Sequence, residues 1–235
     1  MKTLLSLIEK GWVPDVLVRF GIRQLLKVRL ATEFSREPQA AQTRYEKFLK
    51  ELKLSPLGIA TDKANEQHYE VDARFYDLAL GNNKKYSGCY YQEGDDLDTA
   101  ETRMLQKYIE RGRLSDGQQI LELGCGWGSL TLFMASQLPD ASITAVSNSA
   151  SQKAYILSQA EARGLQNITV ITQDINQLKL DQKFDRVVSV EMFEHVRNYQ
   201  QLFSNISAWL KDDGLLFIHV FCHRFLMYPF EEEGD

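Results

Sequence analysis

The pattern of hydrophobic and polar positions changes near residue 60. Before that point, apolar residues recur three or four positions apart, which is the spacing of helices that bury one face. Gly11 and Pro14 interrupt the pattern and separate a first helix from a second. A third helix is expected around Tyr45–Leu52 and to end before Pro56, because the residue before a proline avoids the helical conformation. The pattern therefore predicts an N-terminal helical cap.

A further helix is predicted to begin at Asp98, the N-cap position of a capping box that Glu101 completes three residues later. The aromatic-rich stretch before it belongs to the first part of the chain. We therefore expect a helical cap and substrate-side segment at 1–98, followed by a cofactor-binding domain at 99–235.

Beyond residue 118, short apolar runs alternate with helical periods. Strands are predicted at 119–123, 142–146, 168–172, 184–190 and 214–220. Helices are predicted at 128–138, 149–163 and 198–210, the last being followed by a turn at 213–214. Strands separated by helices are joined by right-handed crossovers and pair in parallel. The predicted fold class is α/β, with a mostly parallel, Rossmann-like sheet flanked by helices.

Composition narrows the range of partners. The 235 residues carry a net charge of -5, which argues against nucleic-acid binding. The first thirty residues are basic and present a face that an anionic membrane could attract, but a solvated face is the favoured interpretation. Three well-separated cysteines suggest neither disulfides nor a zinc site. With no signal peptide or membrane span in the pattern, a cytoplasmic location is expected. Nothing indicates the oligomeric state.

The segment Ile120–Ser129 reads as a strand that enters a glycine loop and then a helix. Gly124 and Gly126 permit positive φ and let a ligand approach the backbone, at the sheet edge where ligands bind in open α/β folds. Ser129 replaces the last glycine of the dinucleotide motif. Dinucleotide binding would also require an acidic residue after the second strand, and none is found there. No Walker motif is present. Glu122 suits a cofactor with a cationic amino-acid end.

After the third strand, Asp174 is placed to accept a hydrogen bond from an adenine amino group, and Ile175 to lie on the ring. An aspartate in this position is more often a helix cap, but here it stands one crossover beyond the glycine loop. Together, these features favour S-adenosyl-L-methionine as the cofactor.

Four motifs carry a resemblance to a known family: E-L-G-C-G-W-G-S, S-N-S-x-S-Q, S-V-E-M-F-E-H and K-Y-S-x-x-Y. The chain resembles the cyclopropane fatty-acid synthase superfamily of methyltransferases and, within it, the coclaurine-type N-methyltransferases of plants. The resemblance implies a class I methyltransferase fold and a set of cofactor-binding residues. These are Tyr86 and Ser87 at the methionine part, Gly124, Gly126 and Gly128 in the loop, Asn148 and Gln152 around the ribose, and Asp174 and Ile175 at the adenine.

Two departures from the cyclopropane synthases shift the expected acceptor. Those enzymes have a cysteine where this chain has Gly88, and a glycine where it has Glu191. The resemblance implies that the neighbourhood of that cysteine holds a bicarbonate base, so its loss, together with the presence of Glu191, favours N-methylation of a small-molecule amine. Family members also continue past Asp235, so the chain is expected to be a truncated form with reduced or absent activity.

The catalytic hypothesis concerns the motif after the fourth strand. Glu191 is expected to anchor a cationic amine, and Glu194 with His195 to remove its proton. Phe193, Tyr199 and Phe221 are candidates for cation–π contact with that amine. E-x-x-E-H lacks paired-histidine metal spacing, so no catalytic metal is expected. Two alternatives remain open: a lipid methyltransferase like the cyclopropane synthases, and a non-catalytic cofactor-binding fragment.

Overall fold

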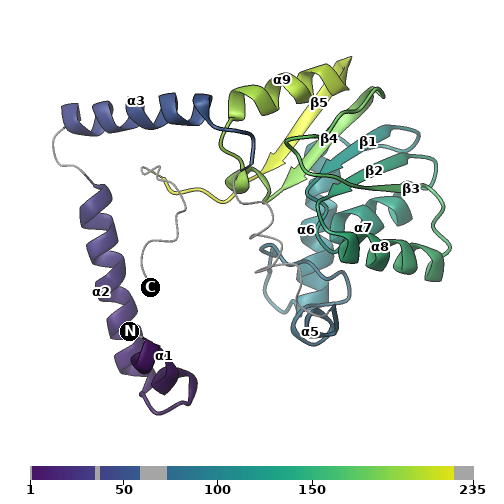
Figure 1. Cartoon of the computed structure of the whole chain (residues 1–235). Coiled ribbons are helices and arrows are strands. Elements are labelled where there is room, and N and C mark those ends of the chain that lie inside the picture. Colours follow the sequence, from purple (N-terminus) through teal and green to yellow (C-terminus); the bar gives the residue numbers. More distant parts are fainter. Residues whose placement is uncertain (1, 35–37, 59–72, 225–235) are drawn as a thin grey trace. The chain divides into compact units, whose positions relative to one another are not determined.

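The computed structural model describes residues 2–34, 38–58 and 73–224 (Figure 1). The chain divides into two compact units, one formed by Met1–Leu52 with Cys222–Asp235 and the other by Lys53–Phe221. The boundary predicted at residues 98 and 99 falls inside the second unit. Side chains of the helix after that boundary bind the loop before it, so the two stretches form one structural unit.

The helical pattern at the N-terminus is confirmed. The helices are α1 Lys2–Glu9, α2 Asp15–Glu33 and α3 Pro38–Leu54. Gly11 adopts a φ of 71° after α1, a conformation that glycine enters without steric cost. Large apolar side chains of α2 such as Leu25 remain exposed. Within the described ranges, no helix is both long and apolar enough to cross a membrane.

The second unit contains a parallel sheet of five strands in the order β3-β2-β1-β4-β5. The strands are β1 Gln119–Leu123, β2 Ser142–Ser147, β3 Ile168–Thr172, β4 Phe184–Val190 and β5 Leu210–His219. The helices are α5 Ala73–Ala79, α6 Leu97–Gly112, α7 Ser129–Gln137, α8 Ala150–Ala162 and α9 Tyr199–Trp209, with a short 3-10 helix η1 at Phe193–His195. The α/β, Rossmann-like prediction is confirmed.

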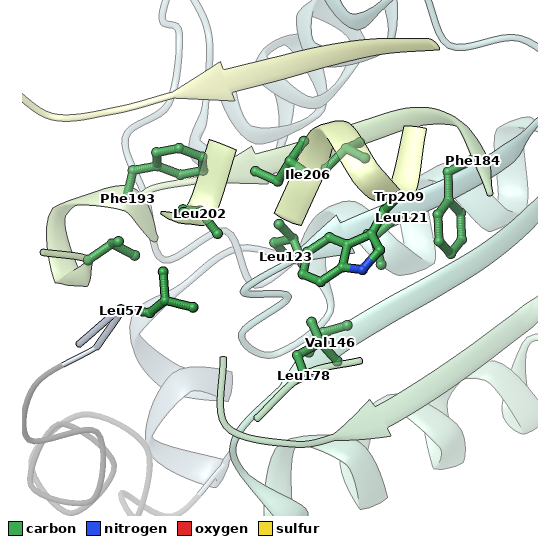
Figure 2. Packing of buried hydrophobic residues seen from close by; sticks show 12 residues of the cluster. Leu57, Leu121, Leu123, Val146, Leu178, Phe184, Phe193, Leu202, Ile206 and Trp209 are labelled. Carbon is green, nitrogen blue, oxygen red and sulfur yellow. The ribbon is translucent and has the colours of Figure 1, made fainter. Parts of the chain in front are cut away.

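Alternate residues of β1 bury themselves on opposite faces of the sheet. Leu121 and Leu123 pack toward α9, in a cluster that includes Leu202 (Figure 2). Ile120 packs on the other face with Met134 of α7 and with side chains of α6. Helices α6, α7 and α8 therefore cover one face and α9 covers the other (Figure 1). Truncating such a fully buried side chain typically costs about 2–5 kcal/mol, so the carboxyl end of β1 is firmly held.

The prediction for the start of β5 was wrong. A turn was expected at 213–214, but the strand already begins at Leu210, which pairs with Phe184 of β4. The register then shifts, and the residues between form a bulge opposite Asp185. Lys211 stabilises that bulge with two hydrogen bonds of 2.8 Å to the Asp185 carboxylate. A sequence pattern does not reveal such a cross-strand contact.

The capping box predicted for α6 was also wrong. Asp96 is the N-cap residue and accepts a 2.9 Å hydrogen bond from the Thr99 backbone N–H. Asp98 instead accepts from the backbone N–H and the side-chain amide of Asn82, both at 2.6 Å. Both acids of the predicted box, Asp98 and Glu101, bind the preceding loop, which leaves Asp96 to cap the helix.

Candidate active site

The three glycines of the loop after β1 have different roles. Gly124 has a φ of 78°, and a Cβ there would lie 2.7 Å from the Met192 side chain. Gly128 has a φ of 79°, and its Cβ would lie 2.6 Å from Ile156 of α8. Gly126, with a φ of 52°, has nothing within 4 Å of a Cβ. The outer glycines therefore permit close packing, whereas Gly126 leaves its backbone open to a ligand.

Facing this loop is a second one, which we call the clamped loop (residues 81–88). The Glu101 carboxylate accepts hydrogen bonds from three of its backbone N–H groups: Gly81 at 3.0 Å, Asn83 at 2.9 Å and Lys85 at 3.2 Å. Glu101 is fully buried. A Cβ on Gly81 would lie 2.5 Å from a carboxylate oxygen of Asp98, so only glycine fits there. The clamp fixes the residues that follow, at the edge of a pocket.

The glycine loop, the clamped loop and the end of β4 line this pocket together. Predicted site residues that line it are Tyr86, Ser87, Glu122, Gly124, Gly126, Glu191 and His195. Predicted site residues outside its lining are Gly128, Asn148, Gln152, Asp174, Ile175 and Glu194. The structure thus brings the expected methionine-end residues together with Glu191 and His195, whereas Glu194 lies outside the lining.

Glu122 is the buried acid of the pocket. Its side chain is 3% exposed and accepts a 2.5 Å hydrogen bond from Thr131 Oγ1. Burial raises the pKa of Glu122 to about 8, although the bond from Thr131 opposes the rise. The carboxyl group is therefore mostly protonated at neutral pH until a cation approaches it. This is the response expected of a site for an ammonium group.

Lys85 and Tyr108 also line the pocket, and sequence reasoning assigned a role to neither. Lys85 Nζ donates to Ser87 Oγ at 2.5 Å and to the Gly88 carbonyl at 2.8 Å, and it lies 4.9 Å from the centroid of the Tyr108 ring. Burial lowers the pKa of Lys85 to about 8 and raises that of Tyr108. The Tyr108 hydroxyl pairs with His219 Nδ1 at 2.7 Å. The K-Y-S motif contained Lys85, but nothing in it indicated that the side chain is buried.

Beyond the pocket, Gln152 presents a hydrogen-bond donor without a partner. Ser147 Oγ donates to Gln152 Oε1 at 2.6 Å, while Gln152 Nε2 is buried and has no partner in the described part of the chain. Ser129 Oγ, at the start of α7, is likewise buried and unpaired there. Asn148, half-buried, lies between Ser147 and Gln152 in the chain. Buried polar groups normally have partners, so these atoms fit a site that a polar ligand completes.

Asp174 is positioned by its own loop. Its Oδ1 accepts hydrogen bonds from the Asn176 backbone N–H at 2.7 Å and from the Asn176 side-chain amide at 2.8 Å. These contacts form an Asx turn, and a turn rather than a helix follows β3, so Asp174 is not the helix cap that an aspartate after a strand more often is. Ile175 is half-buried and packs against the core cluster on the α9 face. The contacts orient both residues, and their role toward adenine stays a prediction.

The three predicted catalytic residues after β4 have different surroundings. Glu191 adopts a φ of 50°, and its backbone N–H donates to the His219 carbonyl at 2.8 Å. His195 is exposed and lines the pocket. Glu194 accepts a hydrogen bond from the Phe221 backbone N–H with one oxygen, while the other is buried without a partner in the described residues. The Glu194–His195 base stays a prediction.

Of the aromatic residues expected to face an amine, Phe193 cannot do so. It is 3% exposed and belongs to the core cluster that includes Leu202. Tyr199 donates its hydroxyl hydrogen to the Phe193 carbonyl at 2.9 Å, and Phe221 is exposed. Among the described residues, no group of three or more His, Cys, Asp and Glu side chains is arranged to hold a metal ion.

Sequence comparisons show which known proteins this chain is similar to. Residues 59–227 match the family described as mycolic acid cyclopropane synthetase. The chain is 37% identical to (S)-coclaurine N-methyltransferase of Thalictrum flavum subsp. glaucum, over 99% of this chain and 65% of that relative. It is 35% identical to cyclopropane-fatty-acyl-phospholipid synthase of Escherichia coli K12, over 66% of this chain and 39% of that enzyme.

Solved structures point the same way. The crystal structure of coclaurine N-methyltransferase bound to N-methylheliamine and SAH superposes with a TM-score of 0.91 at 35% identity, covering 98% of this chain and 68% of that one. A mycolic acid cyclopropane synthase superposes with a TM-score of 0.62 at 23% identity over 69% of this chain and 57% of that one, and so shares the fold. The chain spans about 65% of the length of the first curated relatives.

Proposed function

Because the chain belongs to the mycolic acid cyclopropane synthetase family, we propose that it is an S-adenosylmethionine-dependent methyltransferase acting on the nitrogen of a small amine. The observation that carries this proposal is the placement of Glu191. Glu191 lines the same pocket as the glycine loop, and its backbone has a φ of 50°. Positive φ is unfavourable for residues with a Cβ and clusters at functional sites. A carboxylate at this position is suited to attract a cationic amine.

The chain offers a partner for each part of the cofactor. Gly126 leaves its backbone open beside the pocket, and Glu122 is ready to ionise when an ammonium group arrives. Gln152 has a buried unpaired donor for a ribose oxygen. We assign the adenine to Asp174 and Ile175, which follow β3 at the same edge of the sheet.

Residues on the acceptor side must align a nitrogen and leave it unprotonated. Bound S-adenosylmethionine supplies a methyl group that its sulfonium already activates. Alignment of the acceptor by the pocket can contribute about 7–11 kcal/mol, and a positioned base about 3–5 kcal/mol. We assign anchoring of the amine to Glu191 and removal of its proton to Glu194 with His195, which leaves the nitrogen lone pair free. Positioning is the larger of the two effects, so Glu191 matters most.

The nature of the amine follows from the relatives. Coclaurine N-methyltransferases are similar over 97–99% of this chain, so an isoquinoline amine of the coclaurine type is the proposed acceptor. The E. coli cyclopropane synthase is similar over a smaller share. At the position where cyclopropane synthases are expected to have a glycine, the carboxylate of Glu191 favours a cationic acceptor over a lipid alkene.

The test separates cofactor binding from methyl transfer. Calorimetry should detect binding of S-adenosylhomocysteine to the 235-residue chain. Labelled S-adenosylmethionine should then transfer its methyl group to tetrahydroisoquinoline amines but not to phospholipid vesicles, and Glu191→Gln should lower that transfer at least tenfold. Label in the lipid instead of the amine would contradict N-methylation. Binding with no transfer to any amine would contradict an active enzyme while leaving the cofactor site intact.

A further inference from the structure

The ammonium group of Lys85 is buried without an anionic partner. Lys85 is 3% exposed and lines the pocket. A lysine ammonium has three N–H donors, and two of them bind the neutral oxygens of Ser87 and Gly88. No ion pair to this nitrogen exists among the described residues. A buried charge normally requires a counter-ion, and one donor remains for it.

The acids nearby do not supply that counter-ion. Glu101 binds the clamped loop through both carboxylate oxygens. Glu191 is near enough to raise the pKa of Lys85, although burial lowers that pKa more strongly, and it forms no ion pair with Lys85 in the described structure. Lys84, the neighbouring lysine, differs because it pairs with Asp77. The missing anion at Lys85 is therefore expected from a ligand.

Glu122 is the opposite case in the same pocket. It is a buried acid whose one hydrogen bond comes from the neutral Thr131, with no cation paired to it in the described residues. A pocket that holds one unpaired buried base and one unpaired buried acid is complementary to an α-amino acid, which carries a carboxylate and an ammonium group. Phosphate or a simple carboxylic acid would match only one of them.

We propose that Lys85 binds the carboxylate of the cofactor's amino-acid end, opposite Glu122 at its ammonium group. The inference rests on the proposed function and adds a carboxylate-binding residue to it. The Glu101 clamp positions Lys85 through its backbone N–H, and the Tyr108 ring face supports its ammonium. Recognition of both charges distinguishes the intact cofactor from adenosine derivatives that lack either one.

The experiment compares two ligands on the full chain. One is S-adenosylhomocysteine, and the other is its decarboxylated analogue, which keeps the adenosine, sulfur and amine. Lys85→Gln removes the charge while retaining hydrogen-bonding groups, and Lys85→Met tests the same point without them. The matched control is Lys107→Met, on α6 outside the pocket lining. Calorimetry at pH 7 gives the affinities, and thermal melting shows that each variant is folded.

Loss of a hydrogen bond between two charged groups typically weakens binding about 10- to 100-fold. We expect this loss for S-adenosylhomocysteine with Lys85→Gln, and less than a threefold change for the decarboxylated analogue. Equal losses for both ligands, or none for either, would overturn the inference. If the parent chain binds neither ligand, the proposed function fails instead. The ratio between ligands is measurable even in a variant of lowered stability.

A second readout is the number of protons exchanged on binding, obtained by calorimetry in buffers of different ionisation enthalpy. The pKa of Lys85 is lowered to about 8, so above that pH the free lysine is mostly neutral and must take up a proton to pair with a carboxylate. The parent should therefore take up more protons at pH 8.5 than Lys85→Gln does, and the two should agree at pH 6.5. Identical proton counts at both pH values would argue against a Lys85–carboxylate pair.

Discussion

The two loops that line the pocket are held in place by different means. The glycine loop is fixed by its own backbone, because Gly124 and Gly128 take positive φ where a Cβ would meet Met192 or Ile156. The clamped loop is fixed from outside, because a buried carboxylate of α6, Glu101, accepts three of its N–H groups. One loop therefore depends on the absence of side chains and the other on the presence of one.

This difference determines how each loop can fail. Substitutions in the glycine loop disturb packing between neighbouring elements, so they should lower global stability. Loss of the clamp leaves the sheet intact but frees a segment that makes few other backbone hydrogen bonds. We therefore expect separate signatures, one in global unfolding and the other in local opening and ligand affinity.

The largest effect is expected from Glu101→Ala, which leaves three backbone donors without their acceptor. Each unsatisfied donor costs about 1–3 kcal/mol, so the loss of three acceptor contacts should cost the clamped loop about 3–9 kcal/mol of local stability. Hydrogen exchange of amides 81–88 should become at least 100-fold faster, and S-adenosylhomocysteine affinity should fall. Glu110→Ala, at an exposed position of the same helix, is the control. Unchanged exchange in Glu101→Ala would show that the clamp does not hold the loop.

Gly128→Ala should have the next largest effect and act on the fold itself. Positive φ in a residue with a Cβ costs about 1–3 kcal/mol, and overpacking against Ile156 adds about 1–3 kcal/mol. Urea unfolding should show a total loss of about 2–6 kcal/mol. In Gly126→Ala the new Cβ has open space around it, so the free energy of unfolding should fall by only about 1 kcal/mol. Cofactor affinity should fall more than it does in Gly128→Ala. Equal unfolding losses in the two variants would remove the distinction between the glycines.

The same contrast explains what the sequence could predict. The strands up to β4 and the glycine loop follow from apolar runs and spacing, which are local signals. Asp98 and Glu101 were misassigned to a helix cap. Their hydrogen-bond partners lie 16–20 positions earlier in the chain, and no sequence pattern marks them as partners. The start of β5 at Leu210 depends on the cross-strand pair Lys211–Asp185, which is equally invisible. Interactions between distant polar groups were therefore the information that was missing.

A pH dependence is expected from Glu122, behind the glycine loop. The folded chain holds this proton up to a pKa of about 8, whereas the unfolded chain releases it near the ordinary value of 4.5. The folded state therefore binds more protons in this range, and its stability should fall as pH rises from about 5 to about 8. Glu122→Gln should remove about 2–4 kcal/mol of that decline in urea unfolding at several pH values. Parallel curves for parent and variant would contradict a protonated Glu122.

The smallest effect on stability should come from Glu191→Gly, and its sign is opposite. Glycine adopts a φ of 50° without strain, so the variant should unfold with a free energy up to about 1 kcal/mol higher than the parent. Methyl transfer to amines should nevertheless fall at least tenfold, because no carboxylate faces the cation, while S-adenosylhomocysteine affinity stays within threefold. Glu191→Gln separates the two effects, since it retains the strained backbone and removes only the charge. A Glu191→Gly variant that is less stable than the parent would mean that the side chain is held for packing, and that its strained backbone has no part in recognising the acceptor.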